Sequence, residues 1–150
     1  MILIFVSVLF IGASSCHKEE VTINTENNTP MANGKINITV NSQTFTATLL
    51  DNESATAFKE QLPLTINMVE LNGNEKYYDL PNSLPTNSSN PGMIKSGDLM
   101  LYGSRTLVLF YKSFSTAYSY TKLGAIDDVT GFTSALGSGN VTVTFELLDN

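Results

Sequence analysis

Alternation of apolar and polar residues is the feature that most limits what this chain can fold into. Residues 35–40 read K-I-N-I-T-V, and after Asn41-Ser42 the alternation resumes over residues 44–49. A period of two places the apolar side chains on one face of a strand, and two such segments joined by a short turn pair as an antiparallel hairpin. The chain is therefore predicted to fold mainly as β-structure, with one face of each strand buried.

Strand signals of the same kind continue to the C-terminus. Asn72-Gly73 is typical of a tight hairpin turn. Residues 107–111 are continuously apolar, which predicts a central strand covered on both faces. The remaining strands are expected at residues 64–68, 76–79, 99–102, 120–126 (kinked at Gly124) and 141–145.

A first short helix is predicted after the first hairpin. Apolar residues at i, i+3 and i+7 share one face of a helix over residues 55–62. Asp51 or Asn52 is a suitable N-cap, because each side chain can accept a hydrogen bond from the first helical turn. Pro63 is expected to end the helix.

A second short helix is predicted over residues 129–136, where the same spacing recurs. Asp127 and Asp128 are interpreted as its N-cap, where their charge complements the helix dipole, rather than as a catalytic carboxylate pair. Gly137 is expected to terminate it. Two helices in a series of short strands predict a closed barrel with plugged ends, because closure removes exposed strand edges.

Composition excludes several classes of function. The chain has 150 residues, enough for one domain, and its 8 basic and 14 acidic residues give a net charge of −6, which argues against nucleic-acid binding. Cys16 and His17 are its only cysteine and histidine, so a domain that begins after them has no disulfide, no thiol or imidazole zinc ligand and no Ser–His–Asp triad. No calcium loop, Walker loop or dinucleotide fingerprint occurs, and neither a metal nor a cofactor is expected.

The N-terminus has the pattern of a bacterial lipoprotein signal. Residues 2–13 carry no charge and are too few to span a bilayer, but they suit the apolar region of a signal peptide. Small residues then precede Cys16 in an order that looks like a lipobox, in which the cysteine thiol is lipidated and the residue becomes the new N-terminus. The predicted organisation is a signal peptide over residues 1–15, a lipidated Cys16 with a flexible tether to residue 33, and a folded domain over residues 34–150.

The location follows from the same segment. We expect a bacterial envelope lipoprotein, anchored in the outer membrane through its lipid. Residues 17–20 read H-K-E-E and resemble the acidic export signal of some surface lipoproteins, so both the periplasmic and the surface-facing side stay open. Ordinary signal-peptidase cleavage near Ser15, which would leave Cys16 without a role, is the alternative.

Four segments resemble the bacterial cyclophilin-like domain family. They are residues 71–77, 97–103, 109–116 and 118–126, and the resemblance spans residues 35–146. The family comprises small barrels related in fold to the cyclophilin prolyl isomerases. The resemblance therefore implies a mainly β fold, a closed cyclophilin-like β-barrel with two short helices. It does not define an activity, because one fold supports many functions.

The resemblance also bears on catalysis. Residues 91–98 look like the stretch of true cyclophilins in which an arginine lies three residues before the proline and a glutamine follows the isoleucine. Ser88 and Lys95 hold these positions here, and Ser88 cannot stabilise the twisted imide as a guanidinium does. No catalytic residue is therefore predicted. A residual prolyl isomerase that uses Lys95 or Arg105 as a substitute electrophile is the alternative.

Ligand binding is the function that the sequence favours. Residues 111–120 concentrate aromatic and hydroxyl side chains between two predicted strands, where they can rim a pocket for a peptide or a small molecule. The candidate binding residues are Lys95, Tyr111, Lys112, Ser113, Tyr118 and Tyr120. In the competing interpretation the aromatic side chains only plug one end of the barrel. A purely structural or assembly module is the remaining alternative.

Overall fold

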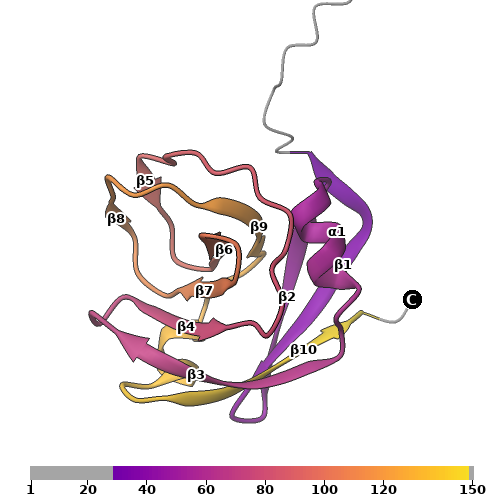
Figure 1. Ribbon diagram of the computed structural model, residues 1–150. Coiled ribbons are helices and arrows are strands. Elements are labelled where there is room, and N and C mark those ends of the chain that lie inside the picture. Colours follow the sequence, from indigo (N-terminus) through magenta and orange to yellow (C-terminus); the bar gives the residue numbers. More distant parts are fainter. Residues whose placement is uncertain (1–28, 149–150) are drawn as a thin grey trace, which may run out of the picture.

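The computed structural model describes residues 29–148 and forms a barrel with two short helices and one small additional sheet (Figure 1). The elements are β1 (Pro30–Val40), β2 (Gln43–Leu50), α1 (Glu53–Lys59), β3 (Leu64–Leu71), β4 (Glu75–Asp79), β5 (Met93–Ile94), β6 (Asp98–Tyr102), β7 (Thr106–Phe110), β8 (Phe114–Ser115), β9 (Thr121–Ile126), α2 (Phe132–Leu136) and β10 (Val141–Leu147). The predicted signal peptide, Cys16 and most of the predicted tether lie outside the described residues.

The barrel is closed and antiparallel throughout. Its strand order is β1-β10-β3-β4-β7-β6-β9-β2, and β2 pairs with β1 to complete the ring. Closure leaves none of these eight strands with an unpaired edge, which is the physical advantage of a barrel over an open sheet. The prediction of a mainly β, closed barrel with two short helices is confirmed.

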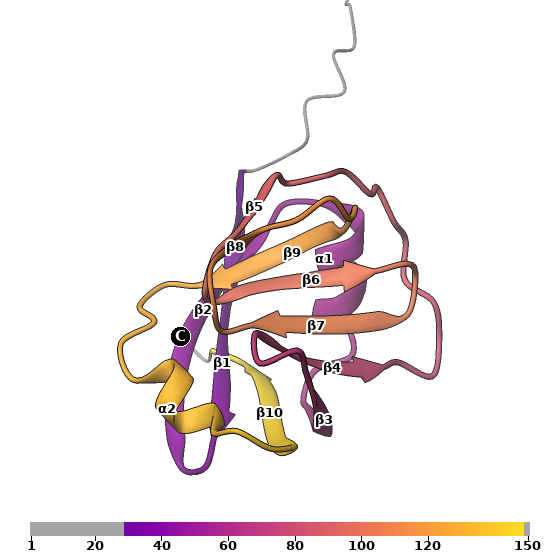
Figure 2. The same cartoon turned by 90° about the vertical axis from the view of Figure 1, so that its left-hand side faces the viewer.

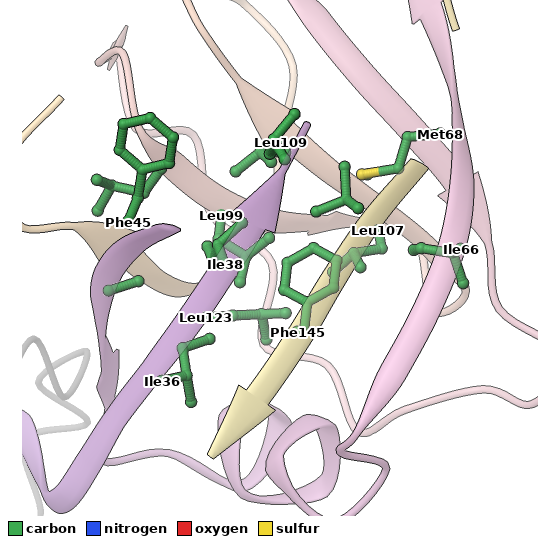
Figure 3. Packing of buried hydrophobic residues seen from close by; sticks show 14 of the residues in the cluster. Ile36, Ile38, Phe45, Ile66, Met68, Leu99, Leu107, Leu109, Leu123 and Phe145 are labelled. Carbon is green, nitrogen blue, oxygen red and sulfur yellow. The ribbon is translucent and has the colours of Figure 1, made fainter. Parts of the chain in front are cut away.

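The core fills the inside of the barrel. Ile36, Ile38 and Val40 of β1 are fully buried, while the residues between them lie on the outer side, as the alternation predicted. Figure 3 shows Ile38, Leu107 and Phe145 pointing into a common interior from three different strands. Apolar side chains thus occupy the inside of the barrel, and the space available to a ligand has to lie elsewhere.

Helix α1 covers the barrel end at which β2 finishes. The side chain of Asn52 accepts a hydrogen bond from the backbone N–H of Ala55 at 2.8 Å, which confirms one of the two predicted caps. Phe58 is fully buried and meets Phe145 edge to face, with ring centroids 5.6 Å apart. The helix ends at Lys59, somewhat earlier than predicted, because the next residues turn away before Pro63.

Helix α2 differs from the prediction at its start. It begins at Phe132 with Gly131 at the N-cap position, and no side chain caps it. The prediction that Asp127 and Asp128 cap this helix is therefore wrong. Asp127 instead forms an ion pair with Lys35 at 2.6 Å, because it directly follows β9 and lies on the outside of the barrel wall. The adjacent residues Asp127 and Asp128 do not by themselves indicate that Lys35, in a distant part of the sequence, is an ion-pair partner.

The position of α2 is nevertheless the expected one, at the other end of the barrel. Figure 2 shows α2 beside the turn between β1 and β2. Asn41, in that turn, donates a hydrogen bond to the carbonyl oxygen of Ala135 at 2.9 Å. Phe132 is fully buried and meets Phe45 edge to face at 5.2 Å. Gly137 ends the helix with φ of 66°, a conformation that favours glycine. The two helices thus cover opposite ends of the barrel, α2 near the start of β2 and α1 near its finish.

Strand β1 begins earlier than the sequence indicated. Pro30 already pairs with Leu50 of β2, and a register shift separates this pair from the regular ladder that starts at Lys35. The segment up to residue 33 was expected to be a flexible tether, but its last part is a strand. The sequence does not indicate this extension, because residues 30–34 lie mostly on the surface and show no alternation of apolar and polar side chains.

Candidate functional site

A second apolar cluster lies on the outer side of the barrel wall. Val108 and Phe110 of β7 and Met100 of β6 are buried although they point away from the interior, where Leu107 and Leu109 lie. Ile94 of β5 and Tyr120 cover them from outside. The prediction that residues 107–111 form a strand covered on both faces is confirmed.

The covering layer consists of two chain segments that run outside the wall. Strand β5 pairs with β8, so that Met93 lies opposite Ser115, and this small sheet is separate from the barrel (Figure 1). Farther along, Ser89 and Tyr120 exchange backbone hydrogen bonds of 3.0 and 2.9 Å. These links hold the segment that follows β8 at a defined place above β6 and β7.

An open groove of about 560 Å³ lies beside this cluster. Its floor is the outer face of β4 and β7, which lie side by side in Figure 2, and its walls are the turn between β3 and β4 and the segment after β8. Its lining residues are Leu71, Asn72, Asn74, Glu75, Tyr77, Asp79, Tyr102, Thr106, Val108, Phe114, Ser115, Thr116, Ala117, Tyr118 and Tyr120. The volume lies within the range of about 300 to 1,000 Å³ that is usual for ligand pockets.

Tyrosine rings dominate one side of the groove. Tyr118 is 64% exposed and Tyr102 is 48% exposed, and their rings meet edge to face with centroids 6.2 Å apart. Tyr102 also contacts the ring of Tyr120 at 5.7 Å, and Tyr120 in turn packs on Phe110 of the buried cluster. Exposed rings that are fixed by buried neighbours offer apolar area at little cost in conformational entropy.

The charges along the groove are all negative. Glu75 and Asp79 lie on the floor, and no lysine, arginine or histidine belongs to the lining within residues 29–148. Burial raises the pKa of Glu75, and the nearby negative charge of Glu70 adds to the effect. Asp79 accepts a hydrogen bond from the hydroxyl of Thr106 at 2.7 Å.

The structure separates the six predicted binding residues. Tyr118 and Tyr120 line the groove, whereas Lys95, Tyr111, Lys112 and Ser113 do not. Lys95 is exposed, and its backbone N–H donates to the carboxylate of Asp98. The side chain of Ser113 accepts a hydrogen bond from the backbone N–H of Ser96, which links the connection between β5 and β6 to the connection between β7 and β8.

Tyr111 belongs to a buried polar cluster inside the barrel. Its hydroxyl donates to Glu70 Oε1 at 2.6 Å, and Lys76 Nζ lies 2.6 Å from Glu70 Oε2 and 5.2 Å from the centre of the Tyr111 ring. Lys76 is fully buried and also donates to the carbonyl oxygens of Gly137 and Gly139. The cluster therefore ties β3 and β4 to the chain that follows α2.

The protonation of this cluster reflects its contacts. Burial works against ionisation of Glu70, but the hydrogen bonds from Lys76 and Tyr111 and the positive charge of Lys76 outweigh it and lower the pKa of Glu70. Burial and the hydrogen bond to Glu70 raise the pKa of Tyr111 to about 12. The sequence analysis did not identify Lys76 as part of a buried cluster. The signal for it was the position of this lysine in the strand ending at Asp79, where alternate residues face the barrel interior.

The residues considered for catalysis do not form a constellation at the groove. Arg105 uses its Nε to donate to the carbonyl oxygen of Leu80 at 2.9 Å, so it holds the loop that follows β4. Ser88 is exposed in the segment between β4 and β5. Neither residue, nor Lys95, is part of the lining.

Within residues 29–148 no three histidine, cysteine, aspartate or glutamate side chains come together as ligands for a metal ion. None of the helices described is sufficiently long and apolar to cross a membrane.

These features define a small closed β-barrel with helices at both ends and a ligand-sized groove on the outside of its wall. A family model described as "Cyclophilin-like family" matches residues 38–146, which is most of the described barrel. The chain therefore belongs to the Cyclophilin-like family. Among curated proteins, none matches the sequence.

Proposed function

We propose that this protein is a bacterial envelope lipoprotein whose cyclophilin-like barrel binds a peptide or small ligand in the outer groove without strong catalysis. The observation that carries the proposal is the groove itself, which has a volume of about 560 Å³ and exposed tyrosine rings. The interior of the barrel is filled by its own core, so a ligand has to bind outside it, and the groove offers both area and depth.

The weak-catalysis part of the proposal is supported by what surrounds the groove. Crossing the roughly 20 kcal/mol barrier of prolyl isomerisation quickly requires a preorganised donor for the twisted imide. The lining within residues 29–148 contains no cationic side chain, and Arg105 is engaged with a backbone carbonyl. Prolyl isomerisation therefore stays the alternative function.

Chemical-shift mapping with mixtures of short peptides and metabolites tests the binding function. A ligand in the groove should produce shifts clustered on Tyr77, Tyr102 and Tyr118, and Tyr118→Ala should weaken them. Val129→Ala, which truncates an exposed apolar residue outside the groove, is the matched control and should leave binding unchanged. Shifts that are absent or scattered over the barrel would favour the structural-module alternative.

Exchange measurements on Xaa-Pro peptides separate binding from catalysis. We expect the rate of cis–trans exchange to stay close to the uncatalysed rate in the presence of the protein. Clear acceleration that is lost in Lys95→Ala or Arg105→Ala would establish the isomerase alternative instead. A variant at Lys112, which is also exposed, serves as the control for a general change in surface charge.

The envelope location rests on Cys16 and on the apolar segment before it. A lipobox cysteine carries two or more acyl chains, and two chains are enough for stable anchoring. Cys16→Ala should therefore move the protein from the membrane fraction to the soluble fraction. Continued retention of the variant in the membrane would contradict the lipoprotein proposal, and protease treatment of intact cells would distinguish the surface from the periplasmic side.

A further inference from the structure

The charge of the groove identifies a class of ligand more specific than peptides in general. Two carboxylates lie on its floor, and no basic side chain belongs to its lining within residues 29–148. Two carboxylates without a counter-cation attract a positively charged ligand and disfavour an acidic one.

Glu75 differs from the other partly buried carboxylates of the barrel. Glu70 is paired with Lys76, and Asp98 is paired with Lys122 at 3.0 Å. Glu75 has neither an ion pair nor a side-chain hydrogen bond with any residue of the described range, although it is partly removed from water. Partial burial without compensation costs free energy, and a ligand cation would offset that cost. The raised pKa of Glu75 is consistent with this cost.

The surroundings of Glu75 suit a cation with an extended apolar stem. Glu75, Tyr77 and Asp79 alternate along β4, so all three point outward to the groove. At about 3.3 Å per residue, the two carboxylates lie roughly 13 Å apart along the strand with the tyrosine between them. The ring of Tyr120 borders the same space, and aromatic faces attract guanidinium and ammonium groups.

We propose that the groove selects extended peptide segments that carry an arginine or lysine side chain, with Glu75 as the anchoring carboxylate and the tyrosine rings as the platform for the stem. Arginine is the better ligand of the two, because its planar guanidinium binds a carboxylate in a bidentate manner and stacks on rings. In an extended ligand, side chains on one face repeat at about 7 Å, so an aromatic residue two positions from the arginine lies above Tyr77. This inference rests on the proposed function of the groove and adds its specificity.

A pair of isosteric peptides provides the test. The probes are acetyl-Ser-Tyr-Gly-Arg-Gly-Tyr-Ser-amide and the same peptide with citrulline, which has the shape of arginine without its charge. Binding to the full chain in nonionic detergent is measured by fluorescence anisotropy and located by chemical shifts. We expect the arginine peptide to bind at least about tenfold more tightly, which corresponds to about 1.4 kcal/mol, and to lose this advantage as salt is raised.

Variants connect the preference to Glu75. Glu75→Gln should make the two peptides bind about equally while leaving the unfolding temperature unchanged or slightly higher, since it removes an uncompensated charge. Glu146→Gln changes an exposed carboxylate on β10 outside the groove, and the preference should persist in it.

The outcomes separate the two proposals. If both peptides bind in the groove with equal affinity, or if the arginine preference persists in Glu75→Gln, the charge selection is wrong and the groove remains a binding site. If neither these peptides nor neutral and acidic peptides produce clustered shifts, the proposed function fails together with the inference.

Discussion

Lys76 allows the most quantitative test of how this barrel is held together. Its ammonium group is fully buried, lies 2.6 Å from Glu70 Oε2, and donates to Gly139 O at 2.6 Å and to Gly137 O at 2.9 Å. Lys76→Met keeps an unbranched side chain that is one atom shorter, and it removes the charge and every donor. A carboxylate and two carbonyl oxygens then lose their partner at one end of the barrel.

The expected cost follows from these contacts. Removing one partner of a buried ion pair costs about 3 to 5 kcal/mol. Glu70 is 21% exposed in its side chain and keeps the hydrogen bonds from Tyr111 and from the backbone N–H of Gly73, so the lower end applies. For a domain of this size, about 3 kcal/mol corresponds to a fall of roughly 12 °C in Tm. Thermal and urea unfolding followed by circular dichroism measures both quantities.

A double-mutant cycle shows whether the ion pair is responsible. Adding Glu70→Gln to Lys76→Met removes the unpaired charge, so the double variant should be more stable than the sum of the single effects by at least about 1 kcal/mol. Lys95→Met makes the same chemical change at an exposed lysine and should stay within about 0.5 kcal/mol of the natural protein. A loss below about 1 kcal/mol for Lys76→Met, or additive effects in the cycle, would refute the reasoning.

Three further outcomes are expected. Gly124→Ala should cost at least about 2 kcal/mol in urea unfolding, because a Cβ there would lie 2.4 Å from the backbone oxygen of Thr48, whereas Gly139→Ala meets nothing and should cost little. Tyr111 keeps its proton to about pH 12 in the folded state and to about pH 10 when unfolded, so its contribution to stability is lost as pH rises through this window. Tyr111→Phe should lack that loss, and an equal decline in both proteins would contradict it. The pKa of Glu70 is lowered in the folded state, so its contribution is present above pH 4.5 and disappears as pH falls through the lower folded value, and the stability gap to Glu70→Gln should close there.

Much of the barrel was predictable because its signals are local. The alternation in residues 35–40 depends only on which face of one strand is buried, and the structure buries Ile36, Ile38 and Val40. The cap at Asn52 likewise involves a hydrogen bond to a backbone group three residues away. Both kinds of signal act over distances that a short stretch of sequence contains, and both predictions are confirmed.

The candidate site was predictable only in part. Tyr118 and Tyr120 were identified from the density of aromatic residues in their segment, and both line the groove. Glu75 was not, because its role depends on β4 lying next to β7 with its odd-numbered residues outward. Tyr111 belongs to the same aromatic segment but points into the barrel core, as the last residue of the apolar run 107–111 and in phase with Leu107 and Leu109.

The sequence by itself determined the mainly β character of the chain, the two helices in their approximate places and the apolar strand with two covered faces, because each depends on side-chain period and neighbouring residues. It also carries the whole basis of the lipoprotein proposal in Cys16 and the residues before it. Only the tertiary structure decided where α2 begins, that Lys76 is buried against Glu70, and that two carboxylates face a tyrosine-lined groove. The physical reason is that these features depend on contacts beyond the local sequence: the carbonyl oxygens of Gly137 and Gly139 meet Lys76 from a distant part of the chain, and β4 lies beside β7 in the closed barrel.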